Sequence, residues 1–400
     1  MITIQPFKAW RPNSDQVEEI ACVPYDVINT EEANELAKGR PNSFLHVIRP
    51  EIDLPDGTDL YSDEVYETGA ANLKRLQENR ILIQDPTPQL YLYQQQMGTH
   101  TQTGLFANVS VKDYDENRIL KHELTRPDKE DDRTRHILTQ RAHAEPVMLT
   151  YKSDDTITRL TNRVLSSSEP VYAFTASDGV IHRVWKIKDN EPFVNAFREV
   201  DSLYVADGHH RCKSASRVAE TLRDGTYGDD EFEFFPAVII PMDEMRILAY
   251  NRLVKQIPDN FLDQLNASFD VQHPANPVPE VPGRISIYTG GEWYSLNLPE
   301  NDSGETVAQL DVSRLHQHIL LPMLGIKDQR TDPNLSFVGG IRGTEELERV
   351  VDKGGAELAI SMYPTQIEEL MSVADEHQLM PPKSTWFEPK LRSGLLVHTF

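Results

Sequence analysis

The chain has 400 residues, 39% of them apolar, which is enough to bury a large core and to form two or three domains. Its 63 acidic residues outnumber 40 basic ones, and the net charge of −23 disfavours binding to nucleic acids or anionic membranes. The opening MITIQPFKAWRP lacks a basic segment followed by an apolar one, and no apolar run reaches membrane-spanning length, so we expect a cytoplasmic protein without a membrane partner.

The sequence contains only two cysteines, Cys22 and Cys212. Two thiols are too few for a disulfide framework or a four-thiolate zinc site. We therefore expect both to be small core residues.

The first part of the chain, residues 1–115, is predicted to be an N-terminal α+β domain. It begins with an irregular, proline-marked stretch and continues with a helix over about 63–79. A hairpin follows, because the strand-like runs 89–96 and 104–111 flank a polar turn from Met97 to Thr103.

The middle part, residues 116–272, is predicted to be a second domain around a strand, a turn and a helix. Its hairpin turn contains Asp178 and Gly179, a pair that accepts positive φ easily. Its expected elements in chain order are a helix near 131–142, a strand over 147–152, hairpin strands over 171–176 and 180–187, a strand over 202–206, a helix carrying Cys212, Ala215, Ala219 and Leu222 at helical spacing, and a buried strand over 234–242.

The proline-rich stretch 273–283 is the predicted linker to a C-terminal α/β domain, residues 284–400. The elements expected there are a hairpin over 284–298, helices near 311–323 and 343–353, a strand over 356–363 and a helix over 365–377. Together the three parts predict an α+β chain.

The strongest local signal is the run Asp207-Gly208-His209-His210-Arg211 between a predicted strand and a predicted helix. The start of a helix presents unpaired backbone N–H groups and a positive dipole end, and a glycine there permits close backbone approach. A phosphate could bind at this turn with Arg211 as its charged partner. The alternative is an N-capping Asp207, a turn glycine and two solvent-facing histidines.

The segment VADGHHRCKSASRVA resembles the strand-turn-helix signature of the sulfiredoxin/ParB-like superfamily, and its DGHHR form is similar to that of free L-serine kinases. The resemblance implies a ParB/sulfiredoxin-like mixed core with N-terminal and C-terminal α/β extensions. It also implies that Gly208, His209, His210 and Arg211 bind nucleotide phosphates, with Asp207 near a metal or the substrate hydroxyl.

A second constellation, Lys121-His122-Glu123, precedes DGHHR in the order that the serine kinases show. There the glutamate is a general base, so the resemblance implies that Glu123 takes the proton of a substrate hydroxyl and that His122 helps to bind the substrate. The alternative is a charged, solvated start of a helix. A zinc-peptidase site is excluded, because Arg126 stands where the second histidine of that pattern is required.

The third segment, Pro381-Pro382-Lys383-Ser384-Thr385, resembles a Pro-Lys-Thr-Thr run near the C-termini of serine kinases. By that resemblance Lys383 would hold a phosphate or the substrate carboxylate, and Ser384 and Thr385 would donate hydrogen bonds. The alternative is an ordinary polar loop.

Two N-terminal runs, CVPYDVI and SFLHVIRPE, place isolated polar side chains among apolar ones. These side chains either reach the site or are hydrogen-bonded partners at a domain edge. They are Tyr25, Asp26, His46 and Arg49. The whole chain also resembles a widespread prokaryotic family that carries the same segments.

The predicted function is therefore a small-molecule kinase that transfers phosphate from ATP or ADP, with Mg²⁺, to the hydroxyl of free L-serine or a similar hydroxy amino acid. One alternative is a ParB-like switch that binds and hydrolyses nucleotide, and another is a non-catalytic protein that binds an amino acid or nucleotide. Sulfiredoxin chemistry needs a reactive cysteine in the turn, whereas Cys212 follows Arg211 inside the predicted helix. The donor nucleotide, the acceptor and the oligomeric state stay open.

Overall fold

The computed structural model describes residues 1–301 and 303–400 and divides into two compact units. Unit 1 comprises Met1–Met245 and Pro389–Phe400, and unit 2 comprises Arg246–Glu388. This division differs from the three predicted ranges 1–115, 116–272 and 284–400. Strands from both sides of residue 115 pair within one sheet, and the proline-rich stretch 273–283 lies inside unit 2, where Gln272 and Ser295 form a β-bridge.

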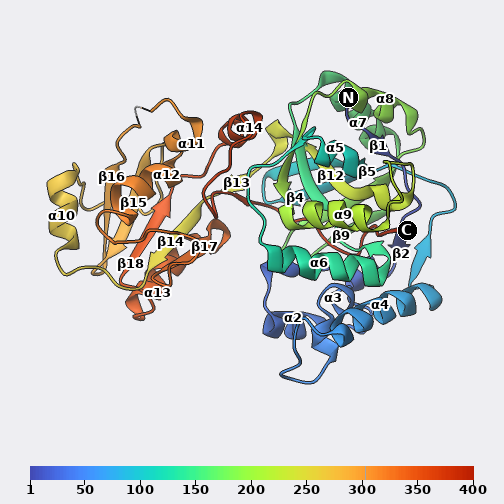
Figure 1. Cartoon of the computed structure of the whole chain (residues 1–400), viewed down its shortest axis with the longest axis horizontal. Helices are drawn as coiled ribbons and strands as arrows, with labels where there is room; N and C mark the ends of the chain where they lie inside the picture. The colour runs from blue at the N-terminus through green and yellow to red at the C-terminus, as the bar shows by residue number, and fades with distance from the viewer. Residues whose placement is uncertain (302) are drawn as a thin grey trace. The chain divides into compact units, whose positions relative to one another are not determined.

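Unit 1 is a mixed α+β structure (Figure 1). It is built on a nine-stranded sheet with the order β6-β11-β8-β12-β5-β4-β10-β9, in which β1 also pairs with β5. The small pairs β2–β3 and β7–β20 complete it. Its strands are β1 (Ile4–Gln5), β2 (Trp10–Pro12), β3 (Leu82–Gln84), β4 (Tyr91–Met97), β5 (His100–Ser110), β6 (Ile119–Leu120), β7 (Ala142–His143), β8 (Val147–Tyr151), β9 (Tyr172–Thr175), β10 (Ile181–Lys186), β11 (Leu203–Asp207), β12 (Phe234–Pro241) and β20 (His398–Thr399).

The helices of unit 1 include the predicted one over 63–79, which is α4. Another, α6, begins earlier than predicted because Pro127 occupies its first turn, where a proline loses no hydrogen bond. The helices are α1 (Val17–Ile20), α2 (Thr30–Ala37), α3 (Leu45–Ile48), α4 (Asp63–Glu78), α5 (Val111–Asp115), α6 (Pro127–Gln140), α7 (Asp155–Ser167), α8 (Glu191–Arg198) and α9 (His209–Leu222).

Both predicted hairpins of unit 1 form. The turn between β9 and β10 is the predicted one, with Gly179 at a φ of 80°. The turn between β4 and β5 is tighter than predicted, because Met97 pairs with His100 and residues 100–103 continue the strand. The short turn aligns Gln95 directly opposite Gln102, so both side chains lie on the same face of the sheet.

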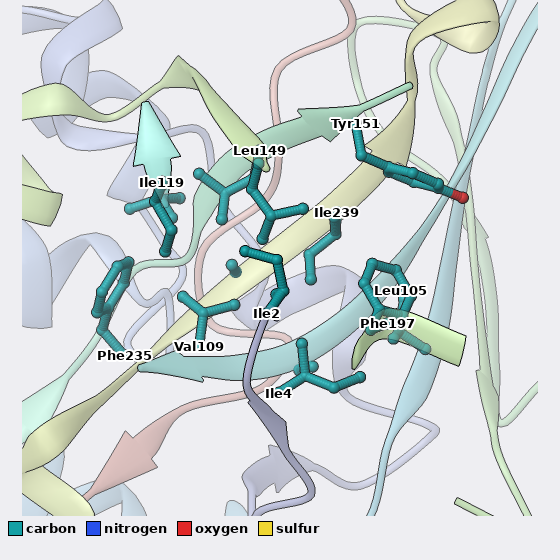
Figure 2. Packing of buried hydrophobic residues seen from close by; sticks show 14 of the residues in the cluster. Ile2, Ile4, Leu105, Val109, Ile119, Leu149, Tyr151, Phe197, Phe235 and Ile239 are labelled. Carbon is teal, nitrogen blue, oxygen red and sulfur yellow. The ribbon is translucent and has the colours of Figure 1, made fainter. Parts of the chain in front are cut away.

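The core of unit 1 packs on one face of the sheet, where alternate residues of the central strands point inward. Figure 2 shows Ile2 and Ile4 against Val109, Leu149 and Ile239, which come from three different strands. Cys212 of α9 belongs to this core, and Cys22 is buried in a second cluster, as the sequence predicts.

Unit 2 is built on a five-stranded antiparallel sheet with the order β16-β15-β18-β14-β17. Its elements are β13 (Ile247–Leu248), β14 (Tyr250–Val254), α10 (Phe261–Ser268), β15 (Arg284–Thr289), β16 (Glu292–Asn297), α11 (Thr306–Gln309), α12 (Asp311–Leu315), β17 (Leu335–Gly339), α13 (Gly343–Asp352), β18 (Leu358–Met362), α14 (Ile367–Asp375) and β19 (Trp386–Phe387). The predicted hairpin over 284–298 is present as β15 and β16. The predicted strand over 356–363 and the predicted helix over 365–377 are present as β18 and α14. In the described residues of both units, no helix has the length and apolar character that crossing a bilayer requires.

Candidate active site

The strand-turn-helix unit predicted around DGHHR is present, as β11, Gly208 and α9. Gly208 has a φ of 101°, which favours glycine, and a Cβ there would lie 3.1 Å from Val147 Cγ1 and from Arg211 Nε. The helix begins at His209, so both histidines belong to its first turn, and it is 14 residues long. The first N–H groups of such a helix have no intrahelical partner, which makes this end suited to an anion.

Asp207 is not the N-cap of α9. It ends β11, Gly208 takes the cap position, and no side-chain capping bond forms. The Asp207 carboxylate instead accepts a hydrogen bond of 3.2 Å from Lys390 Nζ and lies 3.7 Å from Arg211 Nη2. Burial alone would raise the pKa of Asp207, but these two cations lower it to about 2. Asp207 is thus an anion at any physiological pH and a weak base.

Arg211 is buried, with 7% of its surface exposed. Its Nη1 donates to the Pro146 carbonyl, and its Nη2 lies 3.9 Å from Asp26 Oδ2 as well as near Asp207. Although burial opposes its charge, the surrounding carboxylates raise the pKa of Arg211 above its usual value. Its Nε is buried and has no hydrogen-bond partner among the described residues.

The loop that carries Asp26 is fixed by buried and partly buried hydrogen bonds. Arg49 donates to the carbonyls of Tyr25 and Ile28 at 2.9 and 2.8 Å, and the Tyr25 N–H donates to Glu145 at 3.1 Å. Asp26 therefore reaches the turn, whereas Arg49 acts as a structural partner. His46 lies elsewhere, where its Nδ1 contacts Asp53 at 2.7 Å.

His122 and Glu123 follow β6, which pairs in parallel with β11, and this pairing brings them to the turn. The His122 ring packs edge-on against His209 with centroids 4.4 Å apart, and Glu123 Oε2 lies 3.9 Å from His209 Nδ1. Burial lowers the pKa of His209 to about 3, and it lowers that of His122 well below its usual range. Both rings are therefore neutral at physiological pH. Glu123 keeps 39% of its side chain exposed, within reach of a ligand.

His210, in the first turn of α9, accepts at its Nε2 a hydrogen bond of 3.1 Å from the N–H of Arg126, the residue that precedes α6. The bond joins the turn to the segment that follows Glu123. The alternative of two solvent-facing histidines is wrong for His209, which is buried, while His210 is half-buried.

A small cavity of about 30 Å³ lies behind Arg211, with room for about two water molecules. Arg133 and Glu145 also line it, 3.9 Å apart, and the guanidinium of Arg133 covers the ring of Tyr25 at 4.0 Å. Arg133 and Glu145 thus both contact Tyr25, the neighbour of Asp26. The cavity is too small to hold a substrate.

Lys383, Ser384 and Thr385 belong to unit 2, whereas the residues described so far belong to unit 1. Lys383 is exposed, with its Nζ 5.4 Å from the ring centre of Tyr250. Ser384 is buried, and its hydroxyl donates to the Pro381 carbonyl at 2.7 Å. A ligand could accept that hydrogen bond only if the internal one were broken.

Lys390 is the residue that sequence analysis missed. The run Phe387-Glu388-Pro389-Lys390 does not indicate that this lysine lies near Asp207. That position arises because the last twelve residues of the chain belong to unit 1. The structure thus collects Asp26, Glu123, Asp207, Arg211 and Lys390 from four separate segments of one unit.

The donor set fits a magnesium ion only together with a ligand. In the described part of the chain, no group of three or more His, Cys, Asp or Glu residues is arranged to hold a metal. Mg²⁺ commonly takes one or two carboxylates and completes its shell with phosphate oxygens and water. Asp207 supplies such oxygens directly before the turn at Gly208.

The geometry therefore defines a strand-turn-helix site at which charged side chains from several segments meet. The chain belongs to the family described as protein of unknown function (DUF1015), whose model matches residues 4–313. No curated protein matches the chain.

Three solved structures show a remote likeness. A free serine kinase mutant in complex with ADP is 12% identical, covers 70% of this chain and 87% of its own, and has a TM-score of 0.38. SbnI with a C-terminal truncation, from Staphylococcus aureus, is 12% identical, with coverages of 73% and 86% and a TM-score of 0.40. A conserved hypothetical protein from Pyrococcus furiosus is 14% identical, with coverages of 70% and 90% and a TM-score of 0.36. At TM-scores below 0.5, these likenesses establish neither a shared fold nor a shared function.

Proposed function

We propose that this protein is a nucleotide-dependent phosphotransferase that phosphorylates the hydroxyl of free L-serine or a similar hydroxy amino acid. One observation carries the proposal: the base expected at Glu123 and the phosphate turn expected at residues 208–211 meet at His209, although they lie far apart in the sequence. The similarity of VADGHHRCKSASRVA to the turn of the serine kinases supports the same conclusion.

The phosphates of ATP or ADP would bind to the free N–H groups at the start of α9. Helix dipole and guanidinium both favour negative charge there, and the neutral His209 adds a polar group without charge. Mg²⁺, held by Asp207 and the phosphates, would neutralise part of the charge that develops during transfer.

The substrate hydroxyl would lie near Glu123. Its oxygen forms a bond to the terminal phosphorus as the phosphoanhydride bond breaks, the shortened nucleotide leaves, and Glu123 takes the hydroxyl proton. Glu123 is a better base than Asp207, because two cations already hold the proton affinity of Asp207 low. Catalysis would otherwise come from positioning, which a loose transition state mainly requires.

The test is a phosphorus NMR assay of purified protein with Mg²⁺, ATP or ADP and a panel of hydroxy amino acids. A phosphomonoester of the acceptor should appear in step with nucleotide consumption. Nucleotide loss without a phosphorylated acceptor would indicate a hydrolysing switch, and binding without turnover would indicate a binding protein. Either result would overturn the proposal.

A further inference from the structure

The backbone of the returning C-terminal segment is held by two glutamines in the middle of the large sheet. Gln95 Nε2 donates to the Lys390 carbonyl at 2.8 Å, and Gln102 Nε2 donates to Gln95 Oε1 at 2.9 Å and contacts the Pro389 carbonyl at 3.4 Å. Each glutamine is 1% exposed. Burying amides among strands is unfavourable unless their hydrogen bonds are made, so these side chains fix the segment at a defined position.

That position brings a lysine to the phosphate turn. Lys390 Nζ lies 3.2 Å from Asp207 Oδ2, with 14% of the lysine side chain and 24% of the aspartate side chain exposed. Both are thus partly open to a ligand. An ammonium carries three donors, so it can contact Asp207 and a phosphate oxygen at the same time.

Two cations, Lys390 and Arg211, lie within 3.7 Å of the Asp207 carboxylate. Asp26 and the buried Glu145 also act on Arg211, so carboxylates largely compensate the charge of the guanidinium. Lys390 is the more exposed of the two cations, with 14% of its side chain exposed against 8% for Arg211, so an anion at the start of α9 reaches it more readily.

We propose that Lys390 binds the nucleotide phosphate at this turn and that Gln95 and Gln102 are the positioning residues that hold it there. The inference rests on the proposed function, because it takes the ligand to be a nucleotide. It adds a lysine that contacts the phosphate from unit 1, in addition to the role that the sequence suggests for Lys383.

The first test is nucleotide affinity by calorimetry with Mg²⁺ and ADP or ATP for the wild type, Lys390→Met and the exposed control Lys188→Met. We expect Kd to rise roughly tenfold to hundredfold in Lys390→Met, as for loss of a charge-assisted bond, and to stay unchanged in the control. If Lys390 only tied down the C-terminal segment, Lys390→Met would lower the melting temperature and leave Kd unchanged, which would overturn the inference.

Chemical rescue keeps the test valid if Lys390→Met folds poorly. In Lys390→Cys, alkylation with 2-bromoethylamine restores an ammonium at nearly the native position, and both native cysteines are buried and protected. Affinity should fall in the thiol form and return after alkylation. Equal affinity before and after alkylation would contradict a phosphate contact.

The positioning role is tested with Gln95→Leu and Gln102→Leu. Displacing Lys390 should raise the nucleotide Kd as in Lys390→Met, and combining either glutamine substitution with Lys390→Met should raise Kd little further, because both changes remove the same contact. A merely structural glutamine would change the melting temperature, and its effect on Kd would add to that of Lys390→Met. If the wild type binds no nucleotide, the proposed function and this inference both fail. If the wild type binds and the Lys390 variants bind equally well, only this inference fails.

Discussion

Two buried arginines, one in each unit, show what distinguishes the candidate site from ordinary packing. Arg211 lies among the carboxylates of Asp26 and Asp207, and its pKa is raised. Arg252 on β14 is 0% exposed, and its guanidinium contacts the carbonyls of Tyr250 and Lys383 and the ring of Phe337. No described carboxylate pairs with it, and burial lowers its pKa to about 10.

The difference concerns how each guanidinium can be used. Arg252 uses its donors on the backbone of its own unit and holds the Lys383 loop to the sheet. Arg211 is paired with two carboxylates from separate segments, Asp26 and Asp207, that remain partly exposed, so a phosphate could compete with them for the guanidinium. Charge gathered from several segments at the start of a helix therefore indicates a site, whereas a buried charge alone does not.

The largest effect is expected for Glu123→Gln. The variant keeps size and hydrogen bonding but cannot accept the hydroxyl proton, so turnover should fall by roughly 10²–10⁴. Nucleotide affinity and melting temperature should stay close to wild type, since the phosphate contacts lie at 208–211. Single-turnover phosphorylation measures this, with the exposed Glu220→Gln as control. Near-normal turnover would show that Glu123 is not the general base.

The comparison of the two arginines is tested directly with Arg211→Lys and Arg252→Met. Lysine keeps the charge but cannot reach both the Pro146 carbonyl and a phosphate, so nucleotide binding should weaken by roughly 1.5–3 kcal/mol. Replacing Arg252 with an apolar side chain removes a buried charge without an ionic partner, so stability should stay equal or rise. Calorimetry and urea unfolding measure the two effects. If Arg252→Met weakened nucleotide binding and Arg211→Lys did not, the site would lie at Arg252 and not at Arg211.

The turn itself is tested with Gly208→Ala against Gly225→Ala. Both glycines have positive φ, but no atom lies within 4 Å of a Cβ at Gly225, whereas a Cβ at Gly208 would crowd Val147 and Arg211. We expect about 1–2 kcal/mol of destabilisation from φ alone in Gly225→Ala, and about 1 kcal/mol more in Gly208→Ala. Urea unfolding measures both changes in stability. Equal losses of stability in the two variants would show that the backbone around Gly208 shifts to accommodate the added Cβ.

Asp207 should also make the stability of the protein depend on pH in the acid range. Its folded pKa of about 2 lies below the ordinary value of 3.8, so the ionised form stabilises the fold above about pH 4, and this stabilisation is lost as the pH falls toward 2. Its size is on the order of 2 kcal/mol. Asp207→Asn should lose stability near neutral pH and match the wild type near pH 2, with the exposed Asp201→Asn as control. A difference in stability between variant and wild type that does not change with pH would show that the charge of Asp207 is not its cause.

Local sequence determined the elements that need only their own residues. The strand, Gly208 and helix around the turn, the Asp-Gly hairpin and the buried Cys212 follow from positive-φ glycines and from helical and strand periodicity. The order of Glu123 and Arg211 along the chain also pointed to one site, although the sequence could not bring them together.

Only the tertiary structure decided which segments meet. The parallel pairing of β6 with β11 delivers Glu123 to His209, the Tyr25 loop brings Asp26 to Arg211, and buried glutamines place Lys390 beside Asp207. The same packing joined residues on both sides of position 115 in one sheet. Such contacts depend on strand pairing and burial across the whole unit, and no local propensity encodes them, because each segment by itself is compatible with many partners.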